Sequence, residues 1–478
     1  MQIEAIGFAT LLVGFVGWFA GPVFSAYAFM ISNTLGAAGA IILTSFGSAN
    51  IQPPHLLLAF LALPVLAKRG WLQLAAEALA FPKAGFWLLL TTTFGALSAV
   101  FFPRLFAGAT YVFAVTRTEA GTGIVTMPLA PTSGNLTQSI YFIGDLLCFL
   151  VFYNYARKPQ LFEATVRAVL ACTALNVVFA ALDVATYWTS SQDLLSFIRN
   201  AHYRMLDDAS VLGFKRIVGS FPEASAFAYF TLGPLAFCTR LWLANVHARV
   251  TGPLALLSLT ALIFSTSSTG YAGVLGFAAA LLLSGMVRMT TRPVSRSTVA
   301  FVVFAPLLTA ASLVGARLDR PTWTVLQGMV DATVIDKPAS DSGKERSKWN
   351  EQALTNFAET EGLGAGIGSV RASSLPIAVL GSIGAFGAAT YGTFLFGVLF
   401  GRRNRWSEPY PAACQSAARW GCFAQLIGAS VAGSFPDVDL PFFVFAGLAC
   451  AGPAPRRLIY RVPPAMAGSL QYRLGEQS

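Results

Sequence analysis

The longest polar interval of this chain, residues 320–374, reads RPTWTVLQGMVDATVIDKPASDSGKERSKWNEQALTNFAETEGLGAGIGSVRASS. Within it, Ser342-Gly-Lys-Glu345 matches a capping box, in which a serine and a later glutamate satisfy the first free amides of a helix. Three apolar side chains then recur every fourth residue and give that helix one apolar face: Trp349, Ala353 and Phe357. A glycine-rich segment follows the helix. We therefore expect a folded, partly helical subdomain that lies against an apolar surface.

The rest of the chain is dominated by apolar runs. Of its 478 residues, 55% are hydrophobic and 11% are charged, which excludes a soluble enzyme. Repeated runs are long enough to cross a bilayer and predict an all-α, polytopic transmembrane helical bundle. The predicted spans are 5–20, 22–43, 54–67, 85–102, 139–153, 162–187, 224–243, 252–265, 271–287, 298–316, 376–400, 412–433 and 440–452. Because the first two runs meet at Gly21-Pro22, we expect 12 or 13 helices.

The net charge of +10 comes from basic residues gathered in short connectors between the apolar runs. Arg157-Lys158 and Lys68-Arg69 are examples, and every such connector after residue 68 falls on the same side of the predicted topology. This is the positive-inside pattern, and it places these connectors in the cytoplasm. It argues against nucleic acid as a partner. It also predicts that the large polar loop lies on the opposite, outer side of the membrane.

The topology divides the chain into four parts. We expect transmembrane helices over 1–318, a large outer-loop subdomain over 319–375, further transmembrane helices over 376–452 and a cytoplasmic tail over 453–478. The first residues lack a basic segment and a small-residue cleavage site, so we interpret the first apolar run as a retained span.

The sequence predicts neither a disulfide framework nor a cofactor. All six cysteines lie in or beside apolar runs, no C-x-x-C occurs, and only three histidines are present. Asp437-Val-Asp439 leaves two interpretations open. A pair of acids at this spacing can hold a divalent cation, and one acid of such a pair is often a helix cap. Of the two, we predict that this pair does not hold a metal.

The sharpest motif outside the large loop is Lys215-Arg216-Ile-Val-Gly219-Ser-Phe221-Pro-Glu223-Ala-Ser225, where a polar outer loop meets an apolar run. An arginine at this depth suits the paired oxygens of a lipid phosphate, and Glu223 is a candidate to accept a hydroxyl proton. Snorkelling of Arg216 and capping by Glu223 are the structural alternatives. Asp145 and Asp183, inside apolar runs, are likewise either functional or bonded to a neighbouring helix.

These motifs resemble the O-antigen polymerase and O-antigen ligase superfamily. The likeness covers residues 140–450 and consists of Arg-x-x-Gly-x-Phe-x-Glu-x-Ser at 216–225, the small polar cluster 265–270, Arg346-x-x-Trp349 and the run Gly364 to Ser374. The last run is most similar to the exopolysaccharide polymerase branch. Two departures weaken the ligase interpretation: the cluster 265–270 has no basic residue, and the large loop has no histidine. Arg371 stands about where that histidine is expected.

The resemblance implies a bacterial inner-membrane protein whose large loop is periplasmic. It also implies glycosyl transfer from a polyprenyl-diphosphate-linked oligosaccharide to a sugar hydroxyl of another lipid-linked unit. Arginines would stabilise the departing diphosphate without a metal. The predicted catalytic residues are Arg216, Glu223, Arg346 and Arg371. The predicted substrate-binding residues are Lys215, Trp349, Gly366, Gly368, Ser369 and Asp437, although the glycines also suit close backbone packing.

Two alternatives to a polymerase stay open. The first is ligation of a finished glycan onto a lipid or protein acceptor, and the second is a transporter or flippase for lipid-linked glycans. Beyond membrane lipids, the partners that the resemblance implies are a chain-length regulator and export machinery.

Overall fold

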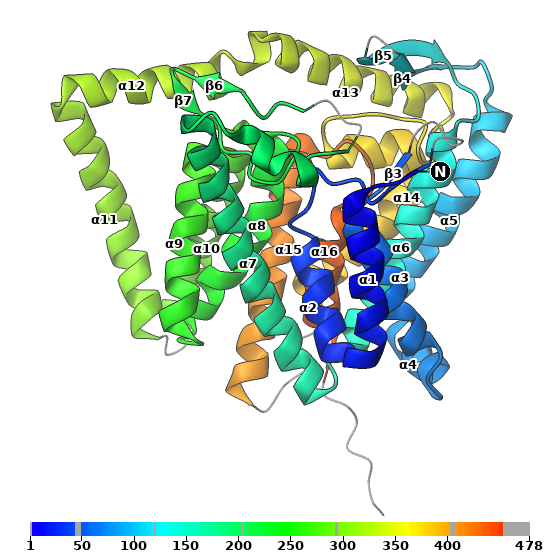
Figure 1. Ribbon diagram of the computed structural model, residues 1–478, viewed down its shortest axis with the longest axis horizontal. Coiled ribbons are helices and arrows are strands. Elements are labelled where there is room, and N and C mark those ends of the chain that lie inside the picture. The colour runs from blue at the N-terminus through cyan, green and yellow to red at the C-terminus, as the bar shows by residue number, and fades with distance from the viewer. Residues whose placement is uncertain are drawn as a thin grey trace, which may run out of the picture.

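The computed structural model describes residues 2–43, 49–118, 121–201, 205–291, 295–401 and 408–452. The predicted cytoplasmic tail lies outside these ranges, as do several basic residues of the connectors: Arg292, Arg402, Arg403 and Arg405. Helices stand side by side as a bundle, and a layer of shorter helices and strands lies across one end of it (Figure 1). We call this layer the roof. It comprises the strands together with α12, η3, η4 and α13.

Six helices in the described ranges are long and apolar enough to cross a membrane. They are α5 (Ala84–Leu105), α6 (Ser133–Tyr155), α7 (Pro159–Trp188), α10 (Ser268–Thr291), α11 (Arg296–Leu318) and α14 (Leu375–Phe400). A seventh span is formed if α3 (Pro53–Leu66) and α4 (Trp71–Ala78), which meet at a bend of 113°, are counted as one. These helices indicate a multi-pass membrane protein.

The remaining predicted runs are helical too, but several are short. Helices α1 (Ala5–Ala20), α2 (Pro22–Ser32), α9 (Ala248–Phe264) and α16 (Asp439–Cys450) have 16, 11, 17 and 12 residues. A bilayer needs about 20. The other two are α8 (Ala224–Leu243) and α15 (Pro409–Ala432). The count of six or seven full-length apolar helices is lower than the 12 or 13 expected, because four apolar runs form helices too short to span, and α8 and α15, with 20 and 24 residues, are not among the helices apolar enough to cross.

The ambiguous N-terminal region consists of two helices. Gly21, with φ of 91°, separates α1 from α2, and the two helices pack against each other. The predicted span 22–43 is wrong in its second half, since α2 ends at Ser32 and residues Ile41–Leu43 form strand β2.

Short strands add to the predicted helices. β1 (Gln2–Ile3), β2 and β3 (Ala49–Ile51) form an antiparallel sheet, and β4 (Tyr111–Thr118) pairs with β5 (Gly121–Pro128) in a hairpin. A third pair joins β6 (Ser210–Val211) to β7 (Phe214–Lys215). All three sheets lie at the roof end of the bundle (Figure 1).

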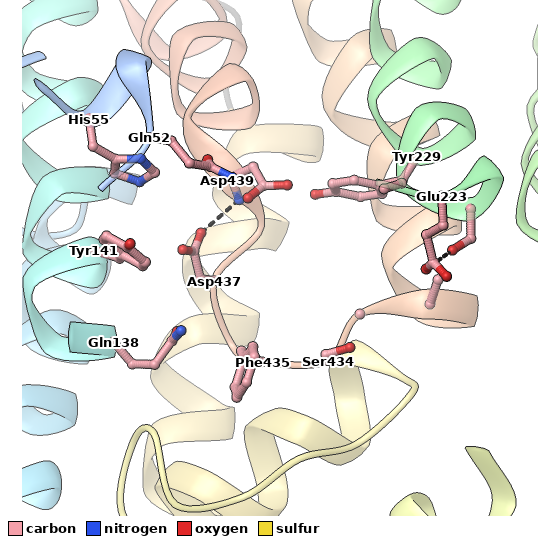
Figure 2. Close-up of a pocket in the computed structure, with 14 residues that line it drawn as sticks. Gln52, His55, Gln138, Tyr141, Glu223, Tyr229, Ser434, Phe435, Asp437 and Asp439 are labelled. Atoms are coloured by element: carbon pink, nitrogen blue, oxygen red, sulfur yellow. Dashed lines mark hydrogen bonds between the residues drawn. The ribbon is translucent and has the colours of Figure 1, made fainter. Parts of the chain in front are cut away.

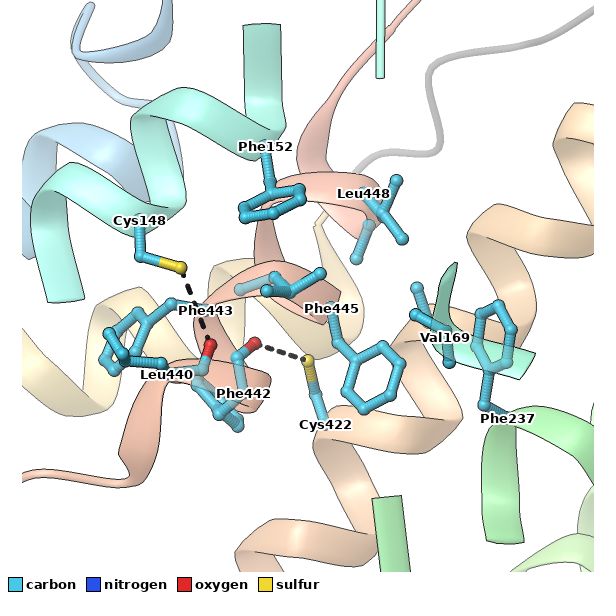
Figure 3. Close-up of a cluster of buried hydrophobic side chains, with 14 of the residues drawn as sticks. Cys148, Phe152, Val169, Phe237, Cys422, Leu440, Phe442, Phe443, Phe445 and Leu448 are labelled. Carbon is cyan, nitrogen blue, oxygen red and sulfur yellow. Dashed lines mark hydrogen bonds between the residues drawn. The ribbon is translucent and has the colours of Figure 1, made fainter. Parts of the chain in front are cut away.

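Helix α16 forms the centre of the bundle. Its residues from Leu440 to Ala449 are buried on every side, as its uniformly apolar sequence requires. Figure 3 shows Phe445 of α16 facing Phe237 of α8, and their ring centroids lie 5.4 Å apart. Twelve residues extend only about 18 Å at 1.5 Å per residue, so this helix ends inside the bundle.

The roof carries the large polar interval. It contains α12 (Arg320–Val330), η3 (Asp331–Ile335), η4 (Lys337–Ala339) and α13 (Asp341–Glu359). The expected capping box is wrong by two residues: Ser340 caps α13 by accepting the N–H of Gly343 at 3.2 Å, and Ser342 accepts a hydrogen bond from the Lys337 ammonium. The predicted apolar face is present, since Ala353 is fully buried and α13 packs on α14.

The glycine-rich segment after α13 docks on a break in α14. At Gly384, where φ is 63°, the helix is interrupted. Backbone bonds join the two segments: the N–H of Ala365 donates to Gly381, that of Gly366 to Ser382 and that of Ala385 to Gly362. The loop thus satisfies backbone groups that the break would otherwise leave unpaired inside an apolar bundle.

We expect Gly368→Ala to lower the stability of the protein by about 2 kcal/mol or more. Gly368 has φ of 83°, and an added Cβ would lie 2.3 Å from the backbone oxygen of Gly134, at the start of α6. Thermal unfolding of the detergent-purified protein measures the effect. Gly392→Ala, a helical glycine of α14 with open space around it, is the matched control and should unfold like the wild type. Equal unfolding temperatures for the two variants would contradict the prediction.

Candidate functional site

A buried aspartate fixes the outer loop that carries Arg216. Asp183, near the end of α7, is fully buried and pairs with Arg199 at 2.6 Å and with Lys215 at 3.4 Å. It also accepts the backbone N–H groups of Val218 and Gly219 at 2.8 and 3.1 Å. Asp183 therefore anchors the segment between Arg199 and Gly219, which resolves its two interpretations in favour of a structural role.

Asp183→Ala should destabilise the protein by about 3–5 kcal/mol, because it leaves two buried cations without their partner. The side chains of Arg199 and Lys215 are only 4% and 2% exposed. Expression level and thermal unfolding in detergent test this. Glu163→Ala, which removes an exposed pair with Arg167 at the other end of α7, should change stability by less than about 1 kcal/mol. A similar small loss for Asp183→Ala would argue against the anchor.

Asp183 thereby positions Arg216 at the roof end of the bundle. Arg216 is partly buried, and one terminal nitrogen donates to the backbone oxygen of Thr266 at 3.2 Å. Thr266 lies in the turn between α9 and α10, within the small polar cluster 265–270, whose last three residues begin α10. The Nε of Arg216 is buried and has no hydrogen-bond partner among the described residues. The guanidinium thus has donor capacity left for a ligand.

A second arginine reaches the same region from the segment between α13 and α14. The Arg371 guanidinium carbon lies 4.4 Å from the centre of the Trp349 ring, a cation–π stack between α13 and the segment before α14. Its Nε is also buried without a partner in the described ranges. Asn350 fixes this segment by accepting the N–H of Ser373 at 2.8 Å. The stack holds the guanidinium plane in place and leaves its donors available.

Mutual electrostatic effects show that these groups form one cluster. Burial lowers the pKa of Arg216, with Glu223 opposing the shift and Arg346 adding to it. Burial likewise lowers the pKa of Lys337, where Arg346 and Arg216 add to the shift and Glu223 opposes it. Burial also lowers the pKa of Arg371, against the opposing charges of Glu345 and Glu223.

Arg216, Lys337 and Arg371 therefore lie within electrostatic reach of Glu223, and Arg346 lies within reach of Arg216 and Lys337. We call these residues, with Glu223 and Glu345, the cation cluster. Its four positive and two negative charges leave an excess of positive charge, which suits a doubly charged anion such as a diphosphate. The four residues predicted to be catalytic all belong to it.

The predicted substrate-binding residues divide into two groups. Trp349 belongs to the site through Arg371, and Asp437 lines the cavity described below. The ammonium of Lys215 instead contacts Asp183, the backbone oxygen of Asp207 and that of Arg216, so its three donors are used inside the protein. The structure gives Lys215 a role beneath Arg216, and not one against a ligand.

The loop residues Gly366, Gly368 and Ser369 also make contacts within the protein. Added Cβ atoms would meet the backbone oxygen of Ser98 at Gly366 and that of Gly134 at Gly368. Ser369 accepts a hydrogen bond from Asn135 at 2.8 Å. These contacts match the close-packing interpretation of the glycine run and fix the position of Arg371, two residues further on.

A cavity of about 280 Å³ opens beside the cation cluster and shares Glu223 with it. Figure 2 shows it between α3 and α6 on one side, α8 on the other, and the segment that leads into α16. Its polar lining includes Gln52, His55, Gln138, Tyr141, Tyr229, Asp437 and Asp439. The hydroxyl of Ser225 donates to the Glu223 carboxylate.

Sequence patterns did not identify Lys337, nor most of this lining. Lys337 was one of many charges in a polar interval, and only the short turn η4 brings it to Arg216. Gln138 and Tyr141 lie one turn apart on α6, a spacing that offered a weak signal for a shared polar face.

Within the described part of the chain, no group of three or more histidine, cysteine, aspartate or glutamate side chains is arranged to hold a metal ion. Asp437 accepts the backbone N–H of Asp439 at 2.7 Å, as a local cap does. Comparisons with protein-family models, curated proteins and solved structures find no match to this chain.

Proposed function

We propose that this protein is a membrane glycosyltransferase that joins polyprenyl-diphosphate-linked oligosaccharide units into a longer chain, as in exopolysaccharide or O-antigen synthesis. The observation that carries the proposal is that Arg216, Lys337 and Arg371 come within electrostatic reach of Glu223, with Arg346 in reach of the first two. Guanidinium groups retain their charge in a partly buried site and match paired phosphate oxygens. Such a cluster can bind the donor diphosphate and stabilise it as it departs.

The arrangement of the basic connectors supports a periplasmic site in the bacterial inner membrane. Arg157 and Lys158 lie between α6 and α7, and Arg288 and Arg296 flank the connector from α10 to α11. Since α11 ends next to α12, these connectors lie at the end of the bundle opposite the roof (Figure 1). Cytoplasmic connectors are enriched in arginine and lysine, so the roof and the cation cluster are assigned to the outer face.

The test is a reaction with purified protein in detergent or liposomes and lipid-linked repeat units of one defined length. Products with two or more repeats, formed without added metal, support the proposal. Transfer only to a different lipid or protein acceptor would replace it with a ligase. Unchanged substrate lengths, together with movement of the lipid between leaflets, would overturn it in favour of a transporter.

A further inference from the structure

Three carboxylates face the cavity beside the cation cluster, and no lysine or arginine does so among the described residues. Glu223 contributes one, while Asp437 and Asp439 contribute the others at the start of α16. A ligand that offers hydrogen-bond donors, such as a sugar hydroxyl, complements a lining of this kind. The cavity is therefore suited to the acceptor side of the reaction.

A fourth carboxyl lies behind this lining. Asp145 of α6 is fully buried, and neither of its oxygens is bonded to a donor group in the described part of the chain. It acts on Asp437, and the two carboxyls are close enough to share a hydrogen bond when one is protonated. Two carboxyls in contact cannot both be ionised at low cost, so they hold one proton between them.

A buried phenol completes the surroundings of this pair. Tyr391 of α14 is 1% exposed, its hydroxyl has no partner in the described ranges, and it lies within electrostatic reach of Asp145 and Asp437. A buried polar atom without a partner calls for an explanation, and a catalytic role is one of those known. The surroundings of the two carboxyls thus include a buried phenol.

We propose that Asp437 is the general base that removes the proton from the acceptor hydroxyl, and that Asp145 positions it through a shared hydrogen bond. This inference rests on the proposed function. Glu223 suits the base role less well, because its negative charge already offsets Arg216, Lys337 and Arg371. Protonating it would remove that offset at the moment when the cluster must stay ordered. Glu223 is then the residue that organises the cations.

Glycosyl transfer to the acceptor conserves atoms and charge. The acceptor O–H bond breaks and its proton moves to an Asp437 oxygen, while the acceptor oxygen forms a bond to the anomeric carbon of the donor. The bond from that carbon to the diphosphate oxygen breaks. Its electron pair leaves with the lipid diphosphate, whose charge the cation cluster neutralises. The proton then returns to water through the cavity.

A pH profile distinguishes this role from a structural one. Burial raises the pKa of Asp437, while the N–H of Asp439 and the hydrogen bond from Asp145 oppose the shift. The groups that face Asp437 are Asp145 of α6, Asp439 of α16, Tyr229 of α8, Tyr391 of α14 and His55 of α3. A base must be ionised, so the rate should fall as the pH falls through the pKa of Asp437.

Two substitutions at Asp145 test whether its hydrogen bond sets the pKa of Asp437. Asp145→Leu removes the hydrogen bond that opposes the shift, so the pKa of Asp437 should rise and the acidic limb should move to higher pH. Asp145→Asn keeps a donor and should leave the limb close to its wild-type position.

The experiment measures chain elongation at saturating lipid-linked repeat units from pH 5 to pH 9. Asp437→Asn should lower kcat by about 100-fold or more, while thermal stabilisation by added polyprenyl diphosphate stays as in the wild type. Asp193→Asn, an exposed acid of the outer loop, is the control and should elongate normally.

Wild-type rates in Asp437→Asn, with loss of activity in Glu223→Gln, would overturn the inference and make Glu223 the base. An unmoved acidic limb in Asp145→Leu would overturn the positioning role. Failure of the wild type to elongate any substrate is a separate result, since it rejects the proposed function itself.

Discussion

Arg216→Ala is expected to stop chain growth while the protein still folds and inserts into the membrane. The rate of elongation should fall by about 100- to 1,000-fold, the usual loss when one preorganised donor to a developing anion is removed. The structure predicts little loss of stability, because the guanidinium makes a single hydrogen bond to the described residues, at the backbone oxygen of Thr266. Membrane fractions of a strain carrying the variant, and purified protein with lipid-linked repeat units, measure the two quantities.

Arg104→Ala is the matched control for this experiment. Arg104 is an exposed arginine near the end of α5, and its guanidinium bonds to the backbone of its own helix. Its loss should leave chain length and rate unchanged. Polymer of normal length from Arg216→Ala would remove this residue from the site and would argue against a catalytic role for the cation cluster.

The sequence could predict Arg216 but not the separate role of its neighbour. Both residues stand in one motif at the edge of an apolar run, where two adjacent cations look equivalent. Lys215 ends strand β7, and successive side chains of an extended segment point to opposite sides. Lys215 therefore turns inward to Asp183, while Arg216 turns towards Thr266. Only the register of the strand decides that Lys215 is the structural anchor and Arg216 the candidate ligand-binding group.

Apolar runs predicted where helices occur but not how far each of them extends across a bilayer. Helix α16 has the composition of a span, yet its 12 residues are enclosed by α6, α8 and α15. An apolar sequence indicates only that a segment is removed from water. Burial in lipid and burial against neighbouring helices both satisfy this. The number of crossings thus depends on tertiary packing, which no local pattern contains.

The cavity and its buried acids could not be predicted from the sequence for a similar reason. Asp145 and Asp437 are separated by 292 positions, and an acid inside an apolar run is equally consistent with a bond between helices. Their proximity depends on how α6 packs against α16. A local pattern can mark an acid as unusual, whereas its partner is defined only by the fold.

Arg371→Ala is the second substitution with a large expected effect. Arg371 enters the cluster on a segment fixed at several points, by Asn350 at Ser373 and by the docked glycine loop before it. Its stack on Trp349 leaves the edge of the guanidinium free for two parallel bonds to phosphate oxygens. We expect a loss of about 100-fold in elongation rate, with normal insertion and unfolding temperature.

The lysine variant decides what kind of contact is lost. An ammonium keeps the charge of Arg371 but neither stacks as a plane nor donates two parallel bonds, so Arg371→Lys should recover less than about a tenth of the wild-type rate. Arg317→Ala provides the control, because Arg317 makes a comparable stack, 4.9 Å from the centre of the Trp323 ring, at the junction of α11 and α12. That variant should elongate normally. Strong rescue by lysine would mean that Arg371 acts as a simple positive charge, and the orientation imposed by Trp349 would then be irrelevant to the reaction.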